Sequence, residues 1–205
     1  MSVDTTKTNY IPPAPPDVEP ITLRPATLED APALALVGAA TFLEAYTWMI
    51  PAADIIAFCA QHSTPEAYAK YLSQPTTRIT LAVTGQDVPV GFTLVLAPEL
   101  PEIELQPDDV ELKRIYLFSR FRSKATPVLD HDRNPIPELR GGQALLNAAI
   151  EDARALGAKR LLLGTNAGNE RAIAFYRRNG FEEVGTRTFI VGDQHCFDLI
   201  FAKLL

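Results

Sequence analysis

The segment that most constrains the fold is the apolar run RLLLGTN at residues 160–166, together with the helical patterns on either side of it. A continuous apolar run of this length is typical of a strand that is buried on both faces. Before it, residues 141–157 place apolar side chains on one helical face and end at a glycine. After it, residues 169–180 repeat the arrangement from an asparagine to a second glycine. A buried strand between two amphipathic helices predicts a layered α/β fold.

The remaining hydrophobic patterns predict further strands and helices around this unit. Strands are expected at residues 21–27, 78–85, 88–98, 109–118, 182–192 and 196–205, and helices at residues 27–46, 51–63 and 65–74. The prolines crowded between positions 12 and 20 exclude a helix there, so we predict that residues 1–20 form an extended tail. Residues 21–205 then form one domain, which suits a chain of 205 residues.

Composition narrows the classes of protein and partner. Hydrophobic residues make up 47% and charged residues 21%, as in ordinary globular proteins. A net charge of -6 argues against a nucleic-acid partner and suits small cationic substrates. Two distant cysteines are too few for a disulfide framework, so we expect reduced thiols and a cytoplasmic location. No apolar run is long enough to cross a membrane and no signal-peptide pattern begins the chain, so we predict no membrane partner.

Several segments resemble, in order and spacing, the motifs of the GNAT superfamily of acyl-CoA-dependent N-acetyltransferases. They are ELKRIYL at 111–117, the pair FRSK at 121–124 and GGQALL at 141–146, GAKRLLLGTN at 157–166 and NERAIAFYRRNGF at 169–181. The resemblance covers about residues 21–205. It implies a single α/β domain with a mixed, mostly antiparallel central sheet of about six or seven strands flanked by helices. TFLEAY and TFIVGDQHCFDLI further resemble the bacterial branch that acetylates spermidine and spermine.

The start of the predicted helix at residue 141 has the chemistry of a phosphate cradle. Small residues at a helix N-terminus let backbone N–H groups approach an anion, which the helix dipole also favours. The residues in this position are Gly141, Gly142, Gln143 and Ala144. By analogy with the Arg/Gln-x-x-Gly-x-Gly/Ala loop of the family, Arg122 and Lys124 add positive charge, although the earlier glycine of that loop is missing. The resemblance therefore implies that these six residues bind the pyrophosphate of acetyl-CoA.

The two halves of this cradle are separated by an insertion. Residues 125–141 lie between Lys124 and Gly142, where the family loop is far shorter, so residues at about 125–140 are extra. Their prolines and mixed charges predict an ordered but irregular excursion without a new strand or helix. The segment is either a tolerated surface loop or a lid at the rim of the site.

Acetyl transfer to an amine raises two proton-transfer problems. An alkylamine with a pKa near 10.4 is neutral in only about one part in 2,500 at pH 7, so a proton must be removed directly or through water. By resemblance Glu111 is the candidate base, and its alternative role is a solvated carboxylate at a strand end. The leaving thiolate gains from a hydroxyl acid, for which Tyr176 matches the family tyrosine.

Other residues are expected to hold the pantetheine arm. In the family the strand carrying RIYL splays from the LLLGTN strand and pairs with this arm, which implies backbone contacts from Ile115 and Leu117. Asn169 is expected to bind the arm, to cap the following helix, or both. No second ligand stands at metal spacing from His131 or His195, so no metal is expected.

The acceptor is the least constrained part of the prediction. Residues 98–111 carry six carboxylates and no Lys or Arg, which forms either an acidic mouth for a polyamine or a solvated loop. We expect direct transfer of acetyl from acetyl-CoA to a primary amine of a small molecule. The resemblance suggests polyamines as one candidate class of acceptor. The alternatives are a peptide or protein N-acetyltransferase and a non-catalytic acyl-CoA-binding regulatory module. A homodimer is left open.

Overall fold

The computed structural model describes residues 19–123 and 125–205, so Lys124 and residues 1–18 of the predicted tail lie outside the described residues. Eight strands form one sheet in the order β5-β1-β2-β3-β4-β6-β8-β7. The strands are β1 (Ile21–Pro25), β2 (Arg78–Thr84), β3 (Pro89–Leu96), β4 (Asp109–Leu117), β5 (Val128–Leu129), β6 (Arg160–Asn166), β7 (Glu182–Val191) and β8 (Gln194–Leu204). Only the pairs β1–β5 and β4–β6 are parallel. The predicted mixed, mostly antiparallel sheet is confirmed, with one strand more than expected.

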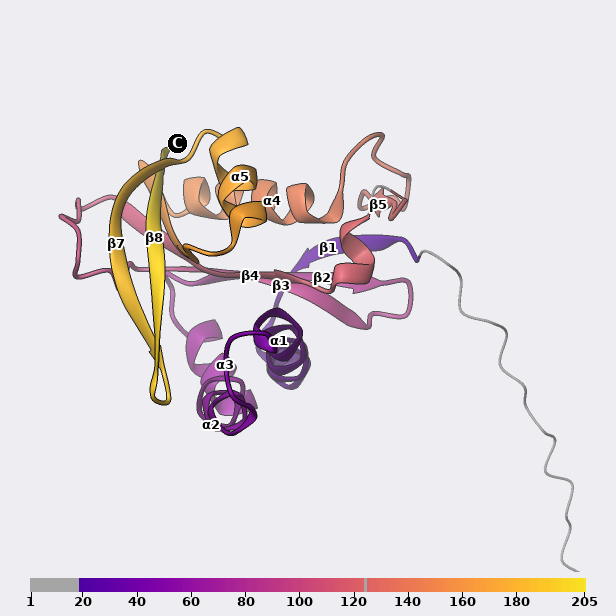
Figure 1. Cartoon of the computed structure of the whole chain (residues 1–205). Coiled ribbons are helices and arrows are strands. Elements are labelled where there is room, and N and C mark those ends of the chain that lie inside the picture. The colour runs from indigo at the N-terminus through magenta and orange to yellow at the C-terminus, as the bar shows by residue number, and fades with distance from the viewer. Residues whose placement is uncertain (1–18, 124) are drawn as a thin grey trace, which may run out of the picture.

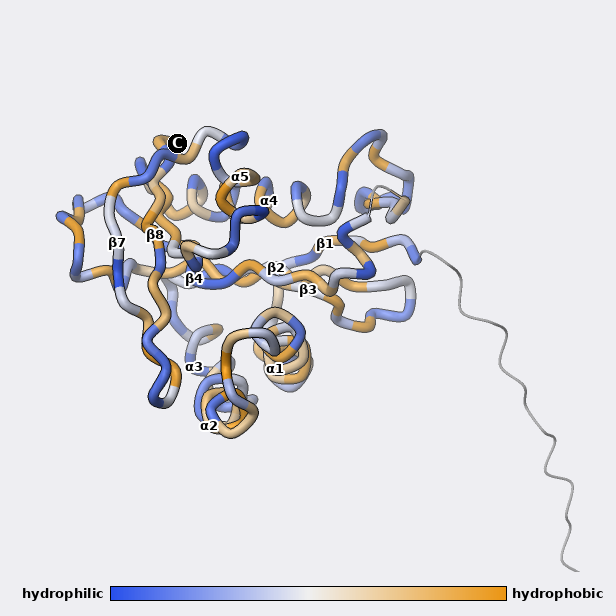
Figure 2. The backbone as a smooth tube through the Cα atoms, viewed as in Figure 1, coloured by the Kyte–Doolittle hydropathy of each residue, from blue (hydrophilic) through white to orange (hydrophobic). Residues whose placement is uncertain are grey.

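Helices cover both faces of this sheet (Figure 1). One face carries α1 (Ala31–Tyr46), α2 (Ala52–His62) and α3 (Pro65–Leu72), and the other carries α4 (Gly141–Ala155) and α5 (Glu170–Arg178). Short 3-10 turns are η1 (Leu28–Asp30) and η2 (Ser119–Arg122). Hydrophobic residues are concentrated in the strands between these layers (Figure 2). The helix ends follow the sequence signals: Asn169 accepts a hydrogen bond from the Ala172 amide at 3.1 Å, and Gly180 after α5 has a φ of +78°.

Two apolar layers hold the helices to the sheet. Beneath α4 and α5, a cluster around Leu146, Leu161 and Phe201 is fully buried. On the opposite face, α1 and α3 pack Leu34 and Tyr68 onto the central strands. Each fully buried side chain of this size contributes about 1.5–3 kcal/mol, so the two layers fix both helix pairs against the sheet. In the described part of the chain, no helix combines the length and apolar character that crossing a bilayer requires.

The parallel strands β4 and β6 separate along their length. They pair only where Asp109–Glu111 faces Arg160–Leu162. Just beyond, β4 has an irregularity in its pairing with β3, because Leu94 pairs with Arg114 and Val95 with Leu112. Such a bulge increases the local twist of a strand and redirects its side chains. The rest of β4 therefore has no partner strand on its β6 side, and a cleft opens there.

The predicted absence of a strand in the insertion is wrong. Val128 and Leu129 form β5, which pairs in parallel with β1 at the edge of the sheet. The Ile21 amide donates to the Pro127 carbonyl at 2.9 Å, and the Ile136 amide donates to the Val128 carbonyl at 2.8 Å. Val128 is also buried in the apolar cluster beneath the start of α4. Proline has no backbone N–H to donate, but its carbonyl can still accept a hydrogen bond. A proline-rich segment can therefore still join a sheet edge.

Candidate active site

A cleft of about 1430 Å³ runs from the start of α4, through the gap between β4 and β6, to the face covered by α1–α3. Of the residues predicted for the site, Ile115, Leu117, Arg122, Gly142, Gln143, Asn169 and Tyr176 line this cleft. Glu111, Gly141 and Ala144 do not line it, and Lys124 lies outside the described residues. The structure thus brings most of the predicted residues into one continuous space.

Of the small residues at the start of α4, Gly141 and Ala144 are packed against the core and Gly142 has open space around it. A Cβ on Gly141 would lie 2.8 Å from a methyl group of Leu117 and 3.0 Å from the Phe121 carbonyl, so this glycine permits close packing. Gly142 has open space where a Cβ would be. Ala144 is buried, and its amide already donates to the Arg140 carbonyl at 2.8 Å. The earlier amides of this first turn have no intrahelical partner, which leaves them as donors beside the cleft.

Arginines surround this helix start. Arg122 donates from Nε to the Leu117 carbonyl at 2.6 Å and pairs with Glu44 at 3.3 Å. Burial lowers its pKa, but a guanidinium remains charged at any physiological pH. Arg140 and Arg171 also line the cleft. Arg171 was missed because an arginine on a polar helix face has no distinctive sequence signal.

The free edge of β4 carries the other predicted cofactor contacts. Ile115 pairs with Thr93, and Leu117 pairs with Gly91, on the β3 side. No β6 residue pairs with β4 beyond Glu111. The edge of β4 that faces away from β3 is therefore unpaired at Ile115 and Leu117, and both residues line the cleft. The Leu117 carbonyl is nevertheless occupied by Arg122. Asn169 lines the cleft while its carboxamide oxygen caps α5.

Tyr176 projects from α5 into the apolar layer and reaches the cleft. It is 7% exposed and packs beside the rings of Phe175, Phe181 and Phe201. Burial raises the pKa of Tyr176 well above its usual value, with a smaller contribution from Tyr116. The hydroxyl is therefore protonated throughout the physiological range, as a general acid must be.

Glu111 lies beneath the cleft wall and is fully buried. One carboxylate oxygen accepts a hydrogen bond from the Glu99 amide at 2.8 Å. The other has no hydrogen-bond partner among the described residues, and lies 3.6 Å from Nη1 of Arg187. Arg187 therefore supplies a positive charge beside this buried carboxyl group.

Sequence reasoning missed the partner of Glu111 and a second carboxylate beside it. Arg187 of β7 extends over Gly164 of β6 and also donates from Nε to Asp198 of β8 at 3.2 Å. Asp198 is 6% exposed and lines the cleft. Burial raises the pKa of Asp198, and the charge of Arg187 opposes that shift. An aspartate within a largely apolar strand, and a glycine within a buried strand, were the signals available in the sequence.

Aromatic rings form the wall next to Asp198. Phe42 stacks on Phe58 with ring centroids 4.2 Å apart, and Phe189 meets Phe58 edge-on. Tyr46 and Tyr116 form a hydrogen-bonded pair whose hydroxyl pKa values are both raised, chiefly by burial. This part of the cleft can hold an apolar group next to an ionised carboxylate.

Three of the six carboxylates of residues 98–111 have cationic partners. Glu99 pairs with Lys113, Asp109 with Arg160, and Glu111 with Arg187. Among the six carboxylates of residues 98–111, Glu99 alone lines the cleft. The segment therefore contributes little uncompensated negative charge to the cleft wall.

The comparisons agree with this arrangement. The acetyltransferase (GNAT) family model matches residues 139–181, from the end of the insertion through α5. The uncharacterized N-acetyltransferases Rv2669 of Mycobacterium tuberculosis and Mb2688 of Mycobacterium bovis are each 28% identical over 178 residues, which span 87% of this chain and 99% of theirs.

Solved structures show the same fold at low identity. PaiA N-acetyltransferase from Thermoplasma acidophilum, in complex with coenzyme A, has a TM-score of 0.65 at 19% identity, covering 90% of this chain and 99% of that one. The spermidine/spermine N-acetyltransferase SpeG from Vibrio cholerae, in mutant form, has a TM-score of 0.58 at 16% identity, covering 90% and 93%. These similarities establish a GNAT fold for this chain.

Proposed function

We propose that the chain is an N-acetyltransferase that transfers acetyl from acetyl-CoA to a primary amine of a small molecule, directly within a ternary complex; its GNAT fold and its similarity to N-acetyltransferases support this. One observation carries the proposal. One cleft connects the start of α4 with the buried carboxylate Asp198, and Tyr176 lies on its wall. Such a cleft can hold a nucleotide thioester and an amine together, which direct transfer requires.

For acetyl-CoA, we assign the pyrophosphate to the start of α4. The free backbone amides of its first turn, including that of Gln143, supply donors, while Arg122 and Arg140 supply charge. The side chain of Gln143 already donates to Asn147 and Asn179. Gly141 and Ala144 support this turn by packing closely beneath it. The pantetheine arm would follow the free edge of β4 at Ile115 and Leu117, near Asn169. Lys124 remains a prediction for this site.

The proposed reaction needs two proton transfers, one from the attacking amine and one to the leaving thiolate. The amine nitrogen attacks the thioester carbonyl carbon, an N–C bond forms, and the C–S bond breaks. Tyr176 donates its proton to the leaving thiolate. The proton lost by the amine goes to the carboxylate pair that shares Arg187. Within this pair Glu111 is the predicted base, but Asp198 is the member that lines the cleft, so we assign the contact with the amine to Asp198.

A panel of acceptors incubated with acetyl-CoA tests the proposal. Free-thiol release and the mass of the acetylated product should identify small primary amines as acceptors, and the panel should include polyamines, amino acids and peptides. Acetyl-CoA at a hundredfold excess over its Kd should also stabilise the fold by about 2.7 kcal/mol. Acetylation of peptides alone would replace the small-molecule assignment, and no thermal shift at millimolar acetyl-CoA would refute the cofactor assignment.

A further inference from the structure

Arg114 is a partly buried arginine in the part of the cleft that faces α1–α3 and Asp198, called here the acceptor half, and it has no carboxylate partner among the described residues. It follows the bulge of β4 and donates from Nη1 to the Tyr68 hydroxyl at 2.8 Å and to the His62 carbonyl at 3.4 Å. Its guanidinium carbon lies 5.4 Å from the centroid of Tyr68 and 5.9 Å from that of Tyr71. Within residues 19–123 and 125–205, no carboxylate lies within 4.0 Å of its nitrogens, although it lines the cleft.

The structure holds Arg114 in place by close packing. Tyr68 is fully buried, and its hydroxyl occupies the space that a side chain on Gly38 of α1 would need. Burial raises the pKa of Tyr68 to about 12, so its hydroxyl is neutral and provides no counter-charge for Arg114. A guanidinium held by rings and neutral acceptors keeps its planar donors available for an anionic group.

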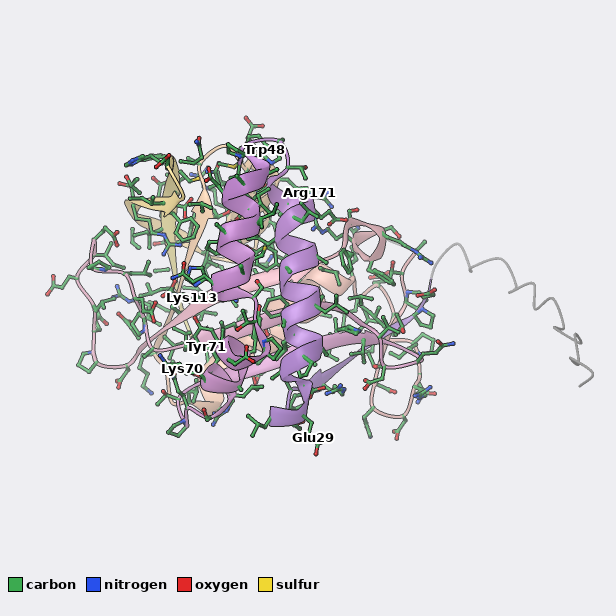
Figure 3. The ribbon with its side chains drawn as sticks, turned by 90° about the horizontal axis from the view of Figure 1, so that it is seen from below. Glu29, Trp48, Lys70, Tyr71, Lys113 and Arg171 are labelled. Atoms are coloured by element: carbon green, nitrogen blue, oxygen red, sulfur yellow. The ribbon has the colours of Figure 1, made fainter. Side chains whose placement is uncertain are left out.

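The groups around Arg114 leave this end of the cleft positive. Lys113 is paired with Glu99, so those two charges cancel. Burial, together with the charges of Arg114 and Lys113, lowers the pKa of His62, which makes His62 neutral at pH 7. Figure 3 shows Lys113 and Tyr71 near the end of α2, whereas Trp48 and Arg171 lie at the opposite end of that helix. Of the two described cations that line the cleft there, Lys113 is paired with Glu99 and Arg114 has no carboxylate within 4.0 Å.

A carboxylate, Asp198, lines the same cleft. Glu111 and Asp198 are two carboxylates that share the single guanidinium of Arg187, which leaves one negative charge in excess. Arg114 and Tyr116 lie two residues apart on β4, so their side chains share a face of the strand, and Asp198 lines the same cleft. The acceptor half of the cleft therefore carries a cation on β4 and a carboxylate on β8.

We propose that the acceptor is an amino acid with an apolar body, whose carboxylate pairs with Arg114 while its amine faces Asp198. This inference rests on the proposed acetyltransferase function and names its substrate class. A guanidinium binds a carboxylate through two parallel hydrogen bonds, which fixes the orientation of the substrate as well as its charge. The rings of Phe42, Phe58 and Phe189 provide the surface for the apolar body. A polyamine would instead place a second cation toward Arg114, which is unfavourable.

Matched acceptors test this assignment. Phenylalanine, phenylalaninamide and phenethylamine share the same ring and a primary amine, but only phenylalanine carries a carboxylate; leucine, leucinamide and isopentylamine form a second series. The wild-type enzyme should prefer the free acid in kcat/KM by about tenfold to a hundredfold, as expected for a charge-assisted hydrogen-bonded pair. A preference for the decarboxylated amines or for polyamines would overturn the proposal.

Substitutions at Arg114 locate the preference. In Arg114→Gln, the ratio of kcat/KM for the free acid to kcat/KM for the matching amine should fall to near one. Arg114→Lys should retain part of this preference because the charge remains. Arg154→Gln is the matched control, since Arg154 is exposed on α4, pairs with Glu151 and does not line the cleft. Thermal unfolding with and without acetyl-CoA reports whether each variant is folded and binds cofactor. An unchanged ratio in folded Arg114→Gln would refute the site.

Failure of the two proposals can be told apart. If no acceptor releases thiol and acetyl-CoA gives no thermal shift, the acetyltransferase assignment fails. If amines are acetylated, but kcat/KM changes neither with the carboxylate of the acceptor nor with substitution of Arg114, the acetyltransferase function stands and the amino-acid acceptor is excluded.

Discussion

The guanidinium of Arg187 occupies the space above Gly164, where a Cβ would lie only 2.6 Å from Nη2. Arg187 reaches Glu111 and Asp198 only because β6 has no side chain at this point. The absence of a side chain in one strand thus determines how two carboxylates in other strands are neutralised.

Gly164→Ala should displace Arg187 and leave two buried carboxylates poorly paired. We expect a loss of about 1–3 kcal/mol in the free energy of unfolding, together with reduced acetyl transfer. Denaturant unfolding and thiol release measure the two effects. Gly85→Ala is the control, because Gly85 has open space around it and should change stability by less than about 0.5 kcal/mol. Equal stability of the two variants would contradict the packing argument.

Tyr176→Phe should lower turnover by roughly 10²–10⁴ and leave acetyl-CoA affinity nearly unchanged, because the hydroxyl acts only as the thiolate leaves. Steady-state kinetics and cofactor titration separate the two quantities. Unchanged turnover, with chemistry shown to be rate-limiting, would leave Tyr176 with a packing role beside Phe181 and Phe201.

The two carboxylates that share Arg187 should differ in their pH dependence. A base must be ionised, so kcat/KM should fall as the pH falls through the raised pKa of Asp198. Asp198→Asn should remove this acidic limb and lower kcat/KM by about 10²–10⁴. Glu111→Gln should mainly reduce stability, because Glu111 does not line the cleft. If the acidic limb disappears in Glu111→Gln and persists in Asp198→Asn, Glu111 is the base.

Removing the insertion should separate its structural role from its contribution to the cleft. Replacing residues 125–139 by one glycine deletes β5 and the buried Val128, so we expect a loss of about 2–4 kcal/mol with the fold retained. Because Arg140 is kept, acetyl-CoA affinity should change by no more than about tenfold.

A second deletion that also removes Arg140 is the matched comparison. It should weaken acetyl-CoA binding by a further factor of about ten, since a cation at the helix start is lost. Changed acceptor kinetics with constant cofactor affinity in the first deletion would show that the segment acts as a lid. Identical kinetics for every acceptor would leave it as an edge element of the sheet.

Local sequence patterns determined much of the architecture. The apolar run of β6, the glycine at the end of α5 and the cap at Asn169 are short-range features, because each depends on neighbouring residues and backbone geometry. The same is true of the small residues that begin α4. For this reason, the sheet type, the helices and the small-residue start of α4 were all predictable.

Tertiary structure alone decided which charges meet. Arg187, Gly164 and Glu111 come from three different strands, and they meet only after β4, β6, β8 and β7 align in one sheet. Arg114 is left without a carboxylate because the bulge of β4 directs it toward Tyr68, whereas Lys113 pairs with Glu99. Charge pairing depends on distance and burial in space, and neither quantity is set by separation along the chain.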